Sequence, residues 1–285
     1  MHNKGIAVLL ISALSFSFAG VFIRFISQDV GTFYQLTVRT LLMTVGFVAI
    51  GLFGKSLTKT AKKDIPLIIF RGVLVVLDFA VFIYAVSHLA LGLSLFIFYA
   101  GSLLSNYLYG YFILKEKLNK IKMISLAFAT LGLVILYAGD FGTIHILGAF
   151  AALVSGLSFG TTSSASKNLS DKYSIAQVNL YAYLIAFVFS AVLLLISGEA
   201  IAITVPVSTW YALIGFSAIF VVAFYGTVYG YKYVQAQYAS LILLSEIVFA
   251  ILVGFIFYSE IPTIAQYVGG ALILTGLIIA AKFEE

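Results

Sequence analysis

Long apolar runs separated by short polar segments are the feature that most constrains what this chain can fold into. They recur through all 285 residues. The hydrocarbon core of a bilayer is ~30 Å thick, and a helix needs ~20 mainly apolar residues to cross it. Measured against that length, the sequence predicts ten transmembrane helices. Their expected ranges are 6–26, 32–53, 66–86, 92–113, 121–138, 146–166, 176–197, 208–230, 238–257 and 265–281.

Composition excludes the main alternatives. Hydrophobic residues make up 62% of the chain and charged residues only 9%, whereas a soluble domain has about 25% charged residues. So few charges could not keep a monomer dissolved in water. The runs are continuously apolar rather than alternating, which argues against a transmembrane β-barrel. We therefore predict an all-α membrane protein.

The sequence lacks the residues that several kinds of chemistry need. The chain has no cysteine, and its histidines, His2, His88 and His145, are far apart. We therefore expect no metal site and no cofactor. No phosphate-binding GxxxxGK[ST] motif occurs, so ATP is not expected to be the direct energy source. The net charge of +5 comes from basic loops and does not indicate nucleic-acid binding.

The lysines predict the orientation. With ten spans, both termini and the even-numbered loops share one side of the membrane, and every lysine falls there: Lys4, Lys55, Lys59, Lys62, Lys63, Lys115, Lys117, Lys120, Lys122, Lys167, Lys172, Lys232 and Lys282. The opposite loops hold Asp29, Asp140, Glu199 and Glu260, with no lysine. Because cytoplasmic loops collect Lys and Arg, we predict cytoplasmic termini and a location in the cell membrane, plasma or inner.

The two halves of the sequence resemble each other. Gly110, Glu116 and Gly132 match Gly254, Glu260 and Gly276 at a constant spacing of 144, and residues 12–16 match residues 155–159 at a spacing of 143. We predict two repeats of five helices, residues 1–143 and 144–285. An odd number of spans inserts the second copy upside down, and inverted repeats are common in secondary transporters.

These stretches resemble the drug/metabolite transporter superfamily, in its EamA-like ten-helix branch. The resemblance is carried by residues 243–254 followed by Glu260, and in the first half by residues 108–116. Glu246 stands at the family's glutamate, and Arg39 resembles an arginine of the second helix. The resemblance implies a central cavity between halves that rock against each other. It also implies packing of the fourth helix on the ninth, for which small residues leave room: Gly101, Ser102, Ser105, Gly110, Ala250 and Gly254.

Three ionisable residues lie deep inside predicted spans: Arg39, Asp78 and Glu246. A charge at the centre of a membrane helix costs ~2.5–3.5 kcal/mol on insertion scales, so it needs a partner or a water-filled cavity. Arg39 and Asp78 fall at similar depths, and a structural ion pair between them is one interpretation. In the other, Asp78 or Glu246 faces the cavity and binds a substrate or a coupling proton.

Other polar and aromatic side chains complete the candidate substrate site. Phe82, Tyr99, Asn106, Tyr225 and Tyr229 would line the cavity or, in the alternative, pack between helices and at the membrane interfaces. Arg71 and Arg24, closer to helix ends, are expected to extend toward the headgroups. For Arg24, a gate contact with Asp29 or with an acidic outer loop is the alternative.

The sequence predicts a secondary active transporter of small organic solutes, first amino acids or related metabolites, that works by alternating access. Efflux of lipophilic cations and transport of nucleotide-linked metabolites remain alternatives within the superfamily. From other classes, an intramembrane lipid-modifying enzyme and a non-transporting scaffold or receptor are weaker alternatives. The expected partners are a small-molecule substrate, the lipid bilayer and a coupling proton, with the chain a monomer or a weak homodimer.

Overall fold

The chain folds into helices joined by short loops. The computed structural model describes residues 2–140, 145–201 and 204–282, and all regular elements in those ranges are helical. The elements are α1 (His2–Ser17), α2 (Ala19–Ile26), α3 (Thr32–Phe53), η1 (Lys62–Asp64), α4 (Ile65–His88), α5 (Leu91–Phe112), α6 (Lys120–Tyr137), η2 (Ala138–Asp140), α7 (Ile146–Ser170), α8 (Ile175–Ser197), α9 (Val207–Tyr233), α10 (Ala236–Leu243), α11 (Ser245–Tyr258) and α12 (Ile264–Lys282).

The helices have the length and composition of a multi-pass membrane protein. Among the described residues, nine helical segments are long and apolar enough to cross a bilayer, and a shorter apolar helix covers Ile264–Ala280. Each predicted span overlaps one of these segments. The prediction of an all-helical membrane protein is thus confirmed.

Two spans are broken, which the sequence analysis did not predict. The first is divided between α1 and α2 at Phe18, and the ninth between α10 and α11 at Leu244. Next to the breaks, the Ser17 hydroxyl donates to the Leu14 carbonyl (2.7 Å) and the Ser245 hydroxyl donates to the Ile242 carbonyl (2.7 Å). Serine hydroxyls that bond to the preceding turn bend helices, so neither break needs a proline.

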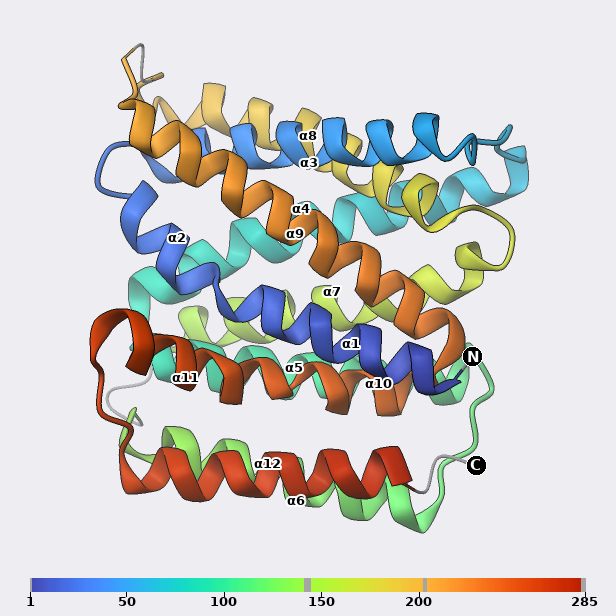
Figure 1. Cartoon of the computed structure of the whole chain (residues 1–285), viewed down its shortest axis with the longest axis vertical. Coiled ribbons are helices and arrows are strands. Elements are labelled where there is room, and N and C mark those ends of the chain that lie inside the picture. Colours follow the sequence, from blue (N-terminus) through green and yellow to red (C-terminus); the bar gives the residue numbers. More distant parts are fainter. Residues whose placement is uncertain (1, 141–144, 202–203, 283–285) are drawn as a thin grey trace.

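The halves of the chain interleave rather than forming separate bundles. Helix α1 packs on α9, α4 and α5 both pack on α7, α3 packs on α8, and α6 packs on α12. In Figure 1, α6 and α12 lie together at one end of the long axis, and α3 and α8 lie at the other end. The buried core therefore lies between the first and second halves.

The loops fall into two sets at opposite ends of the helices. Figure 1 shows the start of α1 and the α3–α4, α5–α6 and α7–α8 loops at the right edge, and the α2–α3, α4–α5 and α11–α12 loops at the left edge. The lysine-bearing loops thus share one edge, which we call the lysine edge.

The backbone repeats as well as the sequence. Within the described residues, four have a positive φ: Lys55 (46°), Lys115 (59°), Gly198 (69°) and Ser259 (54°). They form two pairs, Lys55 with Gly198 and Lys115 with Ser259, spaced by 143 and 144 residues. Corresponding turns therefore occur at corresponding places, in agreement with two repeats. The predicted boundary between residues 143 and 144 falls outside the described residues.

The expected contact between the fourth and ninth spans forms in only one half of the ninth. Helix α5 packs on α10, whereas α11 has α1 and α12 as its main neighbours. Gly110 faces the Gln237 side chain of α10, but Gly254 faces Glu260 in the loop that follows α11, and Gly101 faces α7. The chain turns at Leu244, so Ala250 and Gly254 do not form the predicted interface with α5.

Candidate functional site

Two small cavities lie at mid-span between the repeats. The first, the Asp78 cavity, is lined by residues of α4, α7, α8 and α9 and has a volume of about 20 Å³. The second, the Glu246 cavity, is lined by residues of α5, α7, α9, α10 and α11 and has a volume of about 10 Å³. Phe159 of α7 lines both. Each has room for about one water molecule, so neither has space for an organic solute in this structure.

Asp78 provides the acid of the first cavity. It sits in the middle of α4, is buried, and accepts a hydrogen bond from the Ser155 hydroxyl of α7 (2.5 Å). It forms no ion pair with any described residue. A buried carboxylate without a cation at its side is available to a charged ligand or a proton.

Arg71 provides the positive charge of the same cavity, and its predicted position was wrong. Instead of reaching the headgroups, it is buried, with its Nε donating to the Thr162 carbonyl (3.1 Å) and its Nη1 to the Val178 carbonyl (2.9 Å). The reason is that α4 packs between α7 and α8, whose carbonyls satisfy part of the guanidinium. Arg71 is seven residues before Asp78, which places both on one face of α4.

The predicted ion pair between Arg39 and Asp78 is absent from the described structure. The buried Arg39 guanidinium lies over the ring of Phe216, 4.0 Å from its centroid, where a cation–π contact stabilises the charge. The two residues do not meet because α3 and α4 both pack on α8 rather than closely on each other. Arg39 lines neither cavity.

Glu246 and Tyr99 face each other across the second cavity. Glu246 is partly buried in the first turn of α11, directly after the break at Leu244. Tyr99, on α5, lies with Glu246 in the lining of this cavity. The carboxylate also lies at the positive end of the α11 dipole, which stabilises a negative charge.

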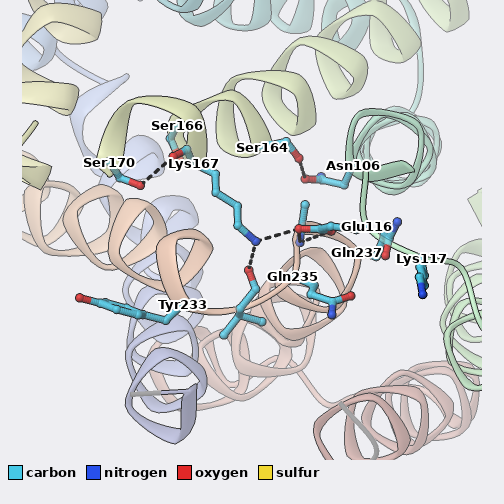
Figure 2. Close-up of polar contacts among 12 residues, drawn as sticks. Asn106, Glu116, Lys117, Ser164, Ser166, Lys167, Ser170, Tyr233, Gln235 and Gln237 are labelled. Atoms are coloured by element: carbon cyan, nitrogen blue, oxygen red, sulfur yellow. Dashed lines mark hydrogen bonds and ion pairs between the residues drawn. The ribbon is translucent and has the colours of Figure 1, made fainter. Parts of the chain in front are cut away.

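The remaining predicted residues lie outside both cavities. Asn106 is buried and accepts hydrogen bonds from Ser164 (2.7 Å; Figure 2) and Tyr231 (2.9 Å), which connects α5 with α7 and α9. Phe82 packs against the ring of Phe98, and Tyr229 against the ring of Tyr233. Tyr225 packs on the hydrophobic core. These contacts pack the four side chains between helices in this structure, and their role in a substrate site stays a prediction.

Most lining residues were missed by the sequence analysis, among them Phe159, Asn179 and Tyr183. None of these carries a signal that separates it from many similar apolar or polar positions. Arg71 does carry one, because an arginine two helical turns from a buried aspartate shares its face. Arg24 follows its alternative prediction: it pairs with Glu260 of the α11–α12 loop at 2.7 Å.

A multi-pass helical bundle with charged cavities between two repeats is the architecture of a membrane transport protein. The chain belongs to the EamA-like transporter family, whose model matches residues 3–138 and again residues 146–281. The family is one of transporters and not of enzymes.

A similar protein agrees with this assignment, and a solved structure shares the fold. An uncharacterized transporter of Archaeoglobus fulgidus is 32% identical over 134 residues, so the match spans about half of each chain, 47% of both. The crystal structure of another protein has a TM-score of 0.85 at 19% identity and covers 100% of this chain and 98% of its own. The second likeness concerns the fold alone.

Proposed function

We propose that this protein is a secondary active transporter of small organic solutes, in the first place amino acids or related metabolites, and that it works by alternating access. The observation that supports this most directly is the Asp78 cavity. It places an unpaired carboxylate and a guanidinium in the middle of the membrane-spanning bundle, between residues of both repeats. Buried charges in such places mark substrate and ion pathways.

The architecture that we propose is ten spans in two inverted repeats, residues 1–143 and 144–285. The helix contacts support it, because the main contacts between the two halves have counterparts with the repeats exchanged. Helix α4 packs on α7 as α9 packs on α1, and α5 packs on α7 as α10 and α11 pack on α1. In addition, α3 pairs with its counterpart α8, and α6 pairs with α12. Such an arrangement can rock around a central site.

The proposed orientation puts the lysine edge in the cytoplasm, following the positive-inside rule. Both termini are then cytoplasmic, and the chain resides in the cell membrane, plasma or inner, as a monomer or a weak homodimer. With this orientation, the lysine edge is the inner edge of the molecule and the opposite edge is the outer edge.

The substrate class follows from the two charges. Arg71 suits a carboxylate, and Asp78 suits an ammonium group. Their positions on α4 differ by a rise of about 10 Å. An amino acid with a second polar or charged group several bonds from its α-carbon would span that distance better than glycine or alanine. Glu246, in the second cavity, is the proposed site of a coupling proton.

Efflux of lipophilic cations is the second candidate function. It is favoured by the lining of the Glu246 cavity, where a carboxylate stands among Tyr99, Tyr231 and apolar side chains with no basic residue. Aromatic rings and a carboxylate together recognise organic cations. A nucleotide-linked substrate fits less well, since Arg71 is the one basic residue that lines either cavity.

Flux measurements with the purified protein in proteoliposomes test the proposal. A panel of radiolabelled L-amino acids is offered with and without a proton gradient, and organic cations are offered in parallel. We expect gradient-dependent accumulation of at least one amino acid, and its loss in Asp78→Asn and Glu246→Gln. If no solute moves in any gradient, the protein is not a carrier of these classes. A thermal-shift screen narrows the panel, because ligands that bind the folded state raise its stability.

A further inference from the structure

Two glutamates end equivalent turns at opposite edges of the molecule. Glu116 follows α5, and its N–H donates to the Gly110 carbonyl (2.8 Å), whereas Glu260 follows α11, and its N–H donates to the Gly254 carbonyl (3.4 Å). Each glutamate is preceded by a residue in the left-handed region, Lys115 or Ser259. The two turns are therefore copies of one local structure.

The basic partners of these glutamates are also repeat-related. Glu116 binds Lys167, at the end of α7, with 2.7 Å between Oε1 and Nζ. Glu260 binds Arg24, at the end of α2, with 2.7 Å between Oε1 and Nη1. Arg24 and Lys167 are 143 residues apart, the spacing of the repeats. Each ion pair thus joins the two repeats, one at the inner edge and one at the outer edge.

We propose that Glu116–Lys167 and Arg24–Glu260 are the inner and outer gates of the transport cycle. This inference rests on the proposed function. The Asp78 and Glu246 cavities lie at mid-span, between the two pairs. Both pairs are formed and both cavities are small, so in this proposal the structure represents the state in which both gates are closed. Breaking one pair while the other holds would open the site to one side only.

The inner gate is the stronger of the two. Figure 2 shows Lys167 reaching across to Glu116, and Lys167 Nζ also donates to the Val234 carbonyl (3.2 Å). The Glu116 carboxylate accepts the backbone N–H of Ala236 at the start of α10 (2.9 Å). Its side chain is 7% exposed and that of Lys167 is 23% exposed. This gate therefore holds the ends of α5, α7 and α10 together.

The outer gate is weaker because water reaches both partners. The Arg24 and Glu260 side chains are 54% and 55% exposed, and pairs that exposed contribute little to stability. Arg24 has one further contact, with its guanidinium 4.6 Å from the ring centroid of Tyr258. From the state in which both gates are closed, the protein accordingly opens to the outside more readily than to the inside.

Cysteine accessibility tests the gates without knowledge of the substrate, and the chain contains no cysteine of its own. Ser240 lines the Glu246 cavity, so Ser240→Cys serves as the reporter for a membrane-impermeant maleimide applied from either side of the membrane. In the Glu116→Gln background, inner labelling should rise on the order of tenfold or more, because a buried charge loses its partner. In the Glu260→Gln background, outer labelling should rise about two- to fivefold. Lys120→Gln, an exposed inner-edge lysine, should change neither.

A charge swap separates gating from folding. Arg24→Glu combined with Glu260→Arg should restore wild-type labelling, whereas each single reversal should increase outer labelling. Glutamine at position 116 keeps an acceptor for the Ala236 N–H, and a single cooperative thermal unfolding transition identifies folded variants. Side-specific labelling shifts support the gates even if no solute is transported. Labelling that does not change in folded variants of an active transporter would overturn the gates and leave the transport function standing.

Discussion

The two cavities on either side of Phe159 differ in the charges that they contain. The Asp78 cavity contains a carboxylate and a guanidinium on one face of α4, together with the Asn179 amide of α8. The Glu246 cavity contains a carboxylate and tyrosines, and no positively charged side chain lines it. A site with both signs of charge suits a zwitterionic solute, whereas a lone carboxylate next to a hydroxyl suits a proton or a cation. We therefore propose that the first cavity binds the substrate and the second binds the coupling ion.

If one cavity binds the substrate and the other the coupling ion, Glu246→Gln should have the largest effect on transport. Glutamine keeps the shape of the side chain but cannot release a proton, so accumulation driven by a proton gradient should be abolished. Exchange of labelled for unlabelled solute across the membrane needs no net proton movement and should continue. Both rates are measured in the same proteoliposomes. Loss of exchange and binding together with accumulation would show that Glu246 belongs to the substrate site.

Asp78→Asn should act on binding instead. Hydrogen bonds to charged groups contribute about 1.5–3 kcal/mol, so the affinity for an amino acid should fall about 10- to 150-fold. The variant should also lose the preference for an amino acid over its N-acetyl derivative, which has no ammonium group. Isothermal titration in detergent measures both. A variant that still prefers the free amine would rule out the proposed contact.

Arg71→Lys should weaken both the site and the fold. Lysine keeps the positive charge but cannot reach the Thr162 and Val178 carbonyls together as the guanidinium does. Leaving a buried acceptor unsatisfied costs about 1–3 kcal/mol, and this should appear as a lower thermal unfolding midpoint. Discrimination between an amino acid and its amide, which lacks the carboxylate, should also decrease. A variant with unchanged stability and unchanged discrimination would remove Arg71 from the proposed substrate site.

The sequence predicted the helices better than the way in which they pack. The positions of the spans follow from the length of each apolar run, which is a local property of the sequence. That the lysine-bearing loops share one edge follows from these positions. The partners of Arg39, Asp78 and Arg71 depend on which helices are neighbours. A depth estimate along each helix could not show that α8 separates α3 from α4, or that α4 is enclosed by α7 and α8.

The candidate site could be predicted only in part, because its residues also depend on which helices are neighbours. Asp78, Tyr99 and Glu246 line the cavities, whereas Asn106, whose buried amide suggested a cavity position, has its hydrogen bonds satisfied by Ser164 and Tyr231. A polar residue at mid-span must have partners, but the sequence does not show whether they are protein groups or ligands.

Of these substitutions, Tyr99→Phe should have the smallest effect on transport. It is also the closest test of whether the two cavities have different roles. It removes only the hydroxyl that Tyr99 offers beside Glu246 in the cavity lining, and a hydrogen bond from such a hydroxyl contributes about 0.5–1.5 kcal/mol. Gradient-driven accumulation should therefore fall about two- to thirteenfold, while solute exchange, which depends on the other cavity, should stay at the wild-type rate. Tyr225→Phe is the matched control, since Tyr225 is also a mid-span tyrosine but lines neither cavity. Equal losses in the two variants would mean that the hydroxyl of Tyr99 has no special relation to Glu246, and the division of labour between the cavities would then lose its support.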